Sequence, residues 1–347
     1  MKQKIPAFGV GRKAVLYLDQ NAISEMAKAL LAPVPSNAQE QWLDLFRRIH
    51  KLVRFQILVC PTSENHHVES HAGRQASAFE DLADALSGGV SFRAFLDIET
   101  EQFRRALHAF VDDLANKVDL RPEEVMTGPL STWTPPIRIG ARLGGGDGYR
   151  EFLEGLRAGQ QPAMDAIWTM WKSSKETFEE IFAKEVHAAP VPGTVTWMNL
   201  AMTALREQPD PGNLLQRFRL SQSVEQVPHV RIRSALYASV ARQVAGGLKQ
   251  LERSLSMDIN TISVVLSYVD AIFVDNFCAA RLSEKPVRAK IPARSVFSKR
   301  TMNELTNWLD ELWRRATLEH FEAVAQLYGL GIGQDFNPLA SAHPAGP

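Results

Sequence analysis

The sequence has little cysteine and no long apolar run. Its two cysteines, Cys60 and Cys278, each lie in an apolar segment, and neither belongs to a CxxC pair. This usage indicates a reduced, cytosolic setting in which both thiols are buried. No stretch reaches the roughly 20 apolar residues that span a bilayer, and the amino terminus has no apolar signal-peptide core. We therefore expect a cytoplasmic protein that is not inserted in a membrane.

The sequence also lacks a net charge. There are 39 lysines and arginines together and 39 aspartates and glutamates together, so no overall positive charge indicates a nucleic-acid partner. Local basic patches would have to bind any such partner. The composition, 45% hydrophobic and 22% charged over 347 residues, is that of a globular protein with one large domain or two ordinary ones.

Strands and helices alternate at both ends of the sequence. Short apolar runs at 14–18, 56–60, 271–274 and 294–298 predict strands. Helical spacing follows the first run until Pro33, and Ser36 with Gln39 predicts a capping box for the next helix. Near the carboxyl end, helical spacing covers 258–268, 277–282 and 301–327.

The middle of the sequence, after a break at Gly88 and Gly89, shows helical periodicity. It predicts helices near 101–117, 149–156, 162–187 and 229–255. We therefore predict an α/β fold with a small, mainly parallel sheet that is flanked by helices and interrupted by a large all-helical insertion. The expected division is a core in two parts, 14–90 and 256–330, an insertion at 91–255 and a disordered tail at 337–347.

Polar side chains follow three of the predicted strands. Asp19 follows the first, Ser63 and Glu64 follow the second, and Asp275 with Asn276 follows the third. Because the carboxyl ends of parallel strands meet at one edge of a sheet, these side chains should share the crevice where ligands bind.

Asp258 adds a fourth acid from the side. It begins the predicted helix that leads into the third of these strands. Four carboxylates in one crevice repel each other and raise one another's pKa values unless cations are bound. Oxygen ligands favour Mg²⁺ or Mn²⁺, and the chemistry implied is hydrolysis of a phosphodiester with one ion or two.

The segments that carry these acids resemble the motifs of PIN-like metal-dependent nucleases. Residues 17–24 (YLDQNAIS) resemble the opening of that family, in which an aspartate ends the first strand. Residues 59–66 (VCPTSENH) are similar to its second acidic motif, and residues 257–276 resemble its third and fourth motifs together. The order of the motifs and their positions on strands carry the resemblance, which covers roughly residues 14–72 and 256–300.

The resemblance implies a set of four catalytic metal ligands, namely Asp19, Glu64, Asp258 and Asp275. A second set of polar residues would support them: Asn21, Ser63, His66, Asp270 and Asn276. Asp270 either orients the site or caps the preceding helix. Most relatives of this kind cut RNA, so the implied activity is that of a Mg²⁺- or Mn²⁺-dependent endoribonuclease acting on single strands.

A basic run follows the third strand and would lie near the proposed crevice. Its members are Arg281, Lys285, Arg288 and Lys290. Such a run can grip a nucleic-acid backbone, or it can be a solvated face.

Each acid alone also has an ordinary structural explanation. Asp19 suits a strand-end turn, Glu64 the first turn of a helix, and Asp258 a helix N-cap. A different class of function stays open as well, that of a non-catalytic PIN-like scaffold whose helical insertion binds a protein or RNA partner.

Three competing chemistries are less well supported. His67 and His71 stand at i and i+4, as zinc ligands often do, but the HExxH spacing is absent. The glycine-rich stretch 144–148 lacks the Lys-Ser/Thr of a phosphate loop. The two cysteines sit in apolar segments, which predicts inert thiols.

Overall fold

The computed structural model of the chain describes residues 13–66, 76–112, 119–133, 151, 155, 165–188, 206, 208–250, 252 and 254–328. Its strands are β1 (Ala14–Leu18), β2 (Leu58–Val59), β3 (Ser91–Phe92), β4 (Met126–Thr127), β5 (Ala271–Phe273) and β6 (Ser295–Phe297). Its helices are α1 (Gln20–Leu31), α2 (Asn37–Arg54), α4 (Ala76–Ser87), α5 (Phe95–Val111), α6 (Pro122–Val125), α8 (Phe178–Ala188), α10 (Pro211–Leu220), α11 (Pro228–Ala245), α12 (Leu255–Val265), α13 (Asn276–Ser283), α14 (Lys285–Lys290), α15 (Met302–Arg315) and α16 (Leu318–Tyr328). The short 3-10 helices are η1 (Gln222–Gln226) and η2 (Lys299–Thr301).

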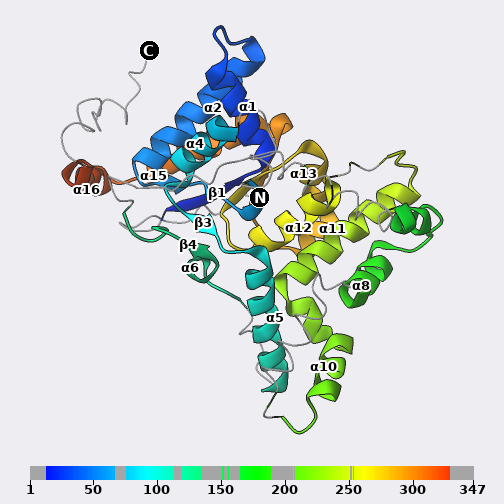
Figure 1. Cartoon of the computed structure of the whole chain (residues 1–347). Helices are drawn as coiled ribbons and strands as arrows, with labels where there is room; N and C mark the ends of the chain where they lie inside the picture. Colours follow the sequence, from blue (N-terminus) through cyan, green and yellow to red (C-terminus); the bar gives the residue numbers. More distant parts are fainter. Residues whose placement is uncertain are drawn as a thin grey trace.

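Four parallel strands form the central sheet in the order β2-β1-β5-β6, with β1 in the middle of the molecule (Figure 1). From β1 the chain continues to β2 on one side and, after the helical region, to β5 on the other. The strand order therefore reverses between β1 and β5, the position at which open α/β sheets form their ligand crevice. The predicted α/β class with a mainly parallel sheet is confirmed.

Helices cover both faces of the sheet, and the residues of β1 show why. Ala14, Leu16 and Leu18 belong to one buried cluster, whereas Val15 and Tyr17 belong to another. Alternate residues of a strand point to opposite faces, so a strand that is buried on both faces is a continuous apolar run. The first cluster includes side chains of α1, α2, α4, α15 and α16, and the second includes side chains of α5, α8, α11, α12 and α13. The helical region therefore packs on the sheet as one of its layers (Figure 1).

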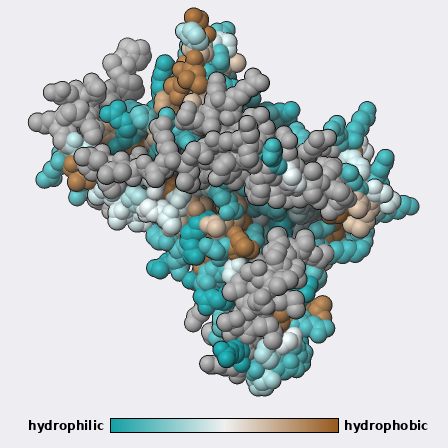
Figure 2. Space-filling view, in the orientation of Figure 1, coloured by the Kyte–Doolittle hydropathy of each residue, from teal (hydrophilic) through white to brown (hydrophobic). Residues whose placement is uncertain are grey.

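The first two helices begin and end where the sequence predicts. Ser36 and Gln39 form the expected capping box at the start of α2, with the Ser36 N–H donating to Gln39 Oε1 at 2.9 Å. The turn that joins α1 to α2 projects from the molecule and exposes Leu30, Leu31 and Val34. This apolar tip is the brown patch at the top of Figure 2.

The region expected to be all helical also contains a short antiparallel ribbon, which corrects that expectation. Ser91 pairs with Thr127 and Phe92 with Met126. The ribbon needs a glycine at position 128, where φ is +92° and an added Cβ would collide with a backbone carbonyl. A strand of two residues is too short to show the alternating pattern from which a strand is predicted.

Three predicted long helices are interrupted. The one at 229–255 ends at Ala245, where Gly246 is the C-cap of α11 and Gly247 has a φ of +97°. A capping side chain explains each of the other two breaks. The predicted helix at 162–187 breaks at 173–177, where Thr177 Oγ1 accepts the Glu180 N–H and so caps α8. The predicted helix at 301–327 is divided into α15 and α16, and Thr317 Oγ1 accepts the His320 N–H at the second start.

Some predictions fall outside the described residues. They are the tail at 337–347, the pair His67 and His71, the glycine-rich 144–148 and, apart from residues 151 and 155, the helix at 149–156. None of the described helices has the length and apolarity that a membrane crossing requires.

Asp270 lies at the amino end of β5, at the opposite edge of the sheet from Asp275. Its Oδ2 accepts the Val15 N–H at 2.9 Å, and its own N–H donates to the Val15 carbonyl at 2.8 Å. Asp275 lies five positions further along the extended chain, roughly 16 Å away. The expected support of the acidic site by Asp270 is therefore corrected, because this side chain ties β5 to β1.

Replacing Asp270 with alanine should destabilise the fold. The change leaves the Val15 N–H without its carboxylate acceptor, which costs about 1–3 kcal/mol. Urea unfolding should show a loss of that size in the free energy of unfolding. Asp112→Ala, at an exposed residue that ends α5, is the control and should change the free energy by less than about 0.5 kcal/mol. Equal stability of Asp270→Ala and the unmodified chain would contradict the role.

Candidate metal centre

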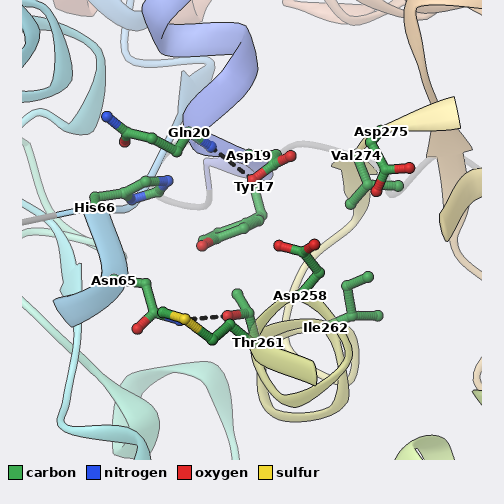
Figure 3. Close-up of a pocket in the computed structure, with 11 residues that line it drawn as sticks. Tyr17, Asp19, Gln20, Asn65, His66, Asp258, Thr261, Ile262, Val274 and Asp275 are labelled. Atoms are coloured by element: carbon green, nitrogen blue, oxygen red, sulfur yellow. Dashed lines mark hydrogen bonds between the residues drawn. The ribbon is translucent and has the colours of Figure 1, made fainter. Parts of the chain in front are cut away.

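A small pocket lies at the carboxyl ends of β1 and β5, where the strand order reverses (Figure 3). It offers about 20 Å³ to a water-sized sphere, and roughly 10–15 Å³ is enough to hold one water. The room therefore suits an ion or a water rather than a bulky ligand. The lining comprises Tyr17, Asp19, Gln20, Asn65, His66, Met257, Asp258, Thr261, Ile262, Val274 and Asp275.

Asp19 directly follows β1 and is the N-cap of α1. Its Oδ1 accepts the Gln20 N–H at 2.7 Å, and its backbone N–H donates to the Phe273 carbonyl of β5 at 2.9 Å. Asn21 Nδ2 lies 3.4 Å from Asp19 Oδ2 and donates to it. Asp19 is thus tied to the neighbouring strand, and Asn21 contacts it as expected.

Asp275 is the N-cap of α13. Its Oδ1 accepts the Phe277 N–H at 2.6 Å and the Cys278 N–H at 3.0 Å. The next residue, Asn276, accepts the Arg300 N–H through its Oδ1 at 3.2 Å. Asn276 therefore holds the start of α13 against η2 and supports the site through this backbone contact.

Asp258 reaches the same pocket from α12. That helix begins at Leu255, so Asp258 lies in its first turn and not at its N-cap. In Figure 3 its carboxylate points from the helix toward the space between Asp19 and Asp275. Burial, and then the negative charges of Asp275, Asp258 and Asp19, raise the pKa of the Cys278 thiol. The three carboxylates therefore act on one shared region.

His66 is buried in the pocket wall and is held through both ring nitrogens. Its Nδ1 accepts the Ser63 N–H at 3.1 Å, so the proton is on Nε2, which donates to the Leu18 carbonyl at 2.7 Å. The ring stacks on Tyr17, whose hydroxyl lies 3.1 Å from Ser63 Oγ. Ser63 and His66 thus fix the chain after β2 to the end of β1, and binding of an ion by His66 would break one of these bonds.

Glu64 points away from the pocket, which differs from its expected place among the metal ligands. Its Oε1 accepts the Phe95 N–H at the start of α5 at 3.3 Å. The pocket is lined instead by the next two residues, Asn65 and His66. Successive residues of a helix are rotated by about 100°, so a shift of one position decides which side chain faces the pocket.

Asn65 is a pocket residue that the sequence did not single out. Its Nδ2 donates to Thr261 Oγ1, which links the chain after β2 to α12 (Figure 3). An amide side chain can also supply a neutral oxygen ligand to a hard cation. Asparagine is common in turns and at helix starts for conformational reasons, so the sequence carries no signal that separates this role from an ordinary one.

The basic run on α13 and α14 does not meet the acids as expected. Because β5 and β6 are parallel, the chain between them returns to the amino edge of the sheet, and α14 leads away from the pocket. Lys290 pairs with Glu179 at 3.1 Å and Glu225 at 3.5 Å. Arg281 Nε lies 3.0 Å from Glu284 Oε1. Both cations are therefore engaged within the protein.

The other two cations of the run, Lys285 and Arg288, stay exposed on α14. Two cations outside the run, Lys299 and Arg300, lie in η2 just after the end of β6. Both η2 side chains are exposed. η2 therefore brings two cations to the carboxyl edge of the sheet.

The donor set of the pocket suits a hard cation. Three carboxylates from separate elements and the Asn65 amide surround a space of ionic size. Zinc favours nitrogen and sulfur ligands, whereas both nitrogens of His66 are already bonded. Within the described residues, no three histidine, cysteine or acidic side chains are closed around one point as a ready-made metal site. The donor types are those that Mg²⁺ and Mn²⁺ prefer, but as placed these acids do not form a group that could hold an ion.

Comparisons with protein-family models, with curated proteins and with solved structures found no match to this chain. What the pocket does must therefore be inferred from its own residues and their geometry.

A buried ionic cluster adjoins Glu64 between α5, α8 and α11. Glu99 of α5 and Arg233 of α11 are both buried, and burial raises the pKa of Glu185 of α8 while Arg233 lowers it. Burial raises the pKa of Glu99 to about 7, against the charge of Arg233 and together with that of Glu64. Burial likewise raises the pKa of Glu64, against the hydrogen bond from Phe95. Glu64 thus belongs to the junction between the sheet and the helical region.

Glu99→Gln should flatten the dependence of stability on pH. The folded chain binds the Glu99 proton more tightly than the unfolded chain, because the pKa rises from an ordinary 4.5 to about 7. The stability from this proton is complete below about pH 4.5 and is lost as the pH rises through about 7. The unmodified chain should therefore lose up to about 3 kcal/mol from this group between about pH 5 and 8.

Urea unfolding at about pH 5 and 8 measures this effect. Glu304→Gln, at an exposed residue of α15, is the control and should keep the profile of the unmodified chain. Parallel profiles for Glu99→Gln and the control would show that Glu99 does not carry the pH dependence.

Proposed function

We propose that this chain is a Mg²⁺- or Mn²⁺-dependent endonuclease of the PIN-like kind, which hydrolyses phosphodiester bonds in single-stranded RNA in the cytoplasm. The observation that carries the proposal is the meeting of Asp19, Asp258 and Asp275 around one small pocket. The pocket lies where the strand order reverses, which is the usual place for a ligand in an open α/β sheet.

A bound divalent cation explains why three acids share so small a space. Carboxylates that face one another repel, and the repulsion raises the free energy of the folded chain. Hard oxygen ligands select Mg²⁺ or Mn²⁺, and Mg²⁺ in particular keeps waters and binds substrate phosphate. When bound, such an ion supplies an activated water and stabilises the leaving oxygen of a phosphodiester.

The chain's own residues then have separate tasks. Asp19, Asp258 and Asp275 would hold the cation, and Asn65 would add a neutral ligand or a hydrogen-bond donor at the wall. The cations of η2 at the same edge would attract the phosphate backbone, which gives affinity without sequence preference.

A scaffold without catalysis is the second candidate. It is favoured by the position of Glu64, whose carboxylate bonds to the N-terminus of α5 and leaves three acids at the pocket in place of four. In such a scaffold the helical region would bind a protein or RNA partner, and no turnover would follow.

Asp19→Asn and Asp275→Asn should each abolish cleavage and leave the fold intact. Asparagine is as good an N-cap as aspartate, so the change removes a charge and preserves the caps of α1 and α13. Loss of the ion removes several kcal/mol of transition-state stabilisation, so the rate of Mn²⁺-dependent cleavage of single-stranded RNA should fall at least about a hundredfold.

Asp112→Asn, which changes the same charge at the exposed C-cap of α5, is the matched control and should cleave at the unmodified rate. Full activity in Asp19→Asn would refute the nuclease proposal. RNA binding by the unmodified chain without turnover would favour the scaffold.

Mn²⁺ should also stabilise the unmodified chain against urea. A ligand that binds the folded state alone adds about 2.7 kcal/mol to the free energy of unfolding at a hundredfold excess over its Kd. Asp258→Asn removes an acid that is not an N-cap, so it should lose most of this increment with little change in stability in EDTA. An equal increment in Asp258→Asn and in Asp112→Asn would show that manganese binds elsewhere.

A further inference from the structure

A basic groove lies between α2 and α15, which pack side by side over the sheet (Figure 1). Its volume is about 310 Å³, at the lower end of the range for ligand sites. The lining comprises Asp44, Arg47, Arg48, Lys51, Leu52, Leu309, Asp310 and Trp313. The three cations outnumber the two acids, so the groove is positive.

Arg48 is held rigidly at the wall of the groove. Its Nε donates to Asp44 Oδ2 at 2.8 Å, and its Nη1 donates to Asp310 Oδ1 at 2.6 Å. These bonds link α2 to α15 and use two of the five N–H donors of the guanidinium. The fork that remains suits a planar or tetrahedral oxyanion.

Lys51 is fixed beside Arg48 by an aromatic contact. Its ammonium lies 3.7 Å from the centre of the Trp313 ring. Burial, and to a smaller extent the charge of Arg48, lower the pKa of Lys51 against the influence of Asp310. Lys51 is exposed at the mouth of the groove and carries the same charge as Arg48, so a bound anion would reduce their repulsion.

Arg47 completes the cationic surface. It lies four residues before Lys51 and seven before Arg54, so all three share one face of α2. Arg47 and Arg54 are exposed, and Arg47 has no ion-pair partner within the part of the chain that the structure describes. These cations therefore lie on one side of Arg48 and can contact an anion together with it.

We propose that this groove binds the phosphate backbone of single-stranded RNA at a distance from the acidic pocket. The proposal rests on the proposed nuclease function and names where a longer substrate would be held. Contact is with phosphate and not with a base, because Lys51 already covers the Trp313 ring. α15 begins next to η2 at the acidic edge and reaches the groove at Leu309, about 11 Å further along its axis.

The test is RNA binding by the double variant Arg47→Glu/Lys51→Glu, measured by fluorescence anisotropy in EDTA with a strand of about 20 nucleotides. We expect binding about tenfold weaker than in the unmodified chain. Each lost phosphate contact lowers the slope of log K against log salt by about 0.7, so the slope should fall by about 1.4. Arg48 is left unchanged because it joins the two helices.

Arg217→Glu/Arg219→Glu on α10 is the matched control, since it makes the same charge change at two exposed positions. Binding reduced equally by the control, or unchanged in the groove variant, would overturn the proposal. Should the charge reversal unfold the protein, Arg47→Gln/Lys51→Gln provides the same test with a smaller loss, about threefold, and a slope still lower by about 1.4.

Inorganic phosphate and a mononucleotide are titrated in parallel. Loss of their binding in the groove variant with RNA binding intact would identify a small-anion site and overturn the RNA assignment. Because these measurements are made in EDTA, they are independent of catalysis. Cleavage unaffected by Asp19→Asn would end the nuclease proposal alone, and RNA binding unaffected by the groove variant would end the groove proposal alone.

Discussion

The acidic pocket depends on the parallel pairing of β1 with β5, two strands that lie 255 residues apart at the bond between Val15 and Asp270. Both ends of the pair are locked. At the amino edge the Asp270 carboxylate and N–H engage the backbone of Val15, and at the carboxyl edge the Asp19 N–H donates to Phe273. Leu18 pairs with Phe273, so Asp19 and Asp275 lie one and two residues beyond the same pair. Without this register Asp19 and Asp275 would not lie together, since the helical region between them in the sequence does not itself bring them together.

Helix N-termini make the crowding of charge at the pocket tolerable without a bound cation. Asp19 caps α1, Asp275 caps α13, and Asp258 lies in the first turn of α12. The positive ends of three helix dipoles therefore point toward the pocket, and each stabilises a nearby carboxylate by roughly 0.3–1 kcal/mol. The same ends attract phosphate. Capping explains the positions of two of the acids, and the dipole of α12 favours the third, Asp258, in its first turn.

The sequence predicted the residues whose positions are set by the ends of strands. It missed those whose positions depend on the rotation of a helix or on the direction in which the chain runs across the sheet. Apolar runs located β1 and β5, and parallel strands bring Asp19 and Asp275 to one edge whatever the details of packing. Glu64 was predicted at the pocket because it follows β2 and matches the second acidic motif, whereas Asn65 and His66, one and two helical steps further on, line the pocket instead. Asp270 was placed near the acids by closeness in sequence, but an extended chain of five residues crosses the whole sheet. The run that ends at Lys290 failed for the same reason, since the chain between parallel strands must return to the far edge.

The helical region adjoins the site through the chain that follows β2, where three consecutive residues contact different elements. Glu64 bonds to the start of α5, Asn65 to α12 and His66 to the end of β1. A displacement of α5 would pull on Glu64 and shift the wall that Asn65 and His66 provide. Glu99, one turn further along α5, is buried as is Arg233 of α11, and burial raises the pKa of Glu99 to about 7. The geometry of the acidic pocket is therefore a joint property of the sheet and the helical layer, and its chemistry cannot be assigned to the sheet alone.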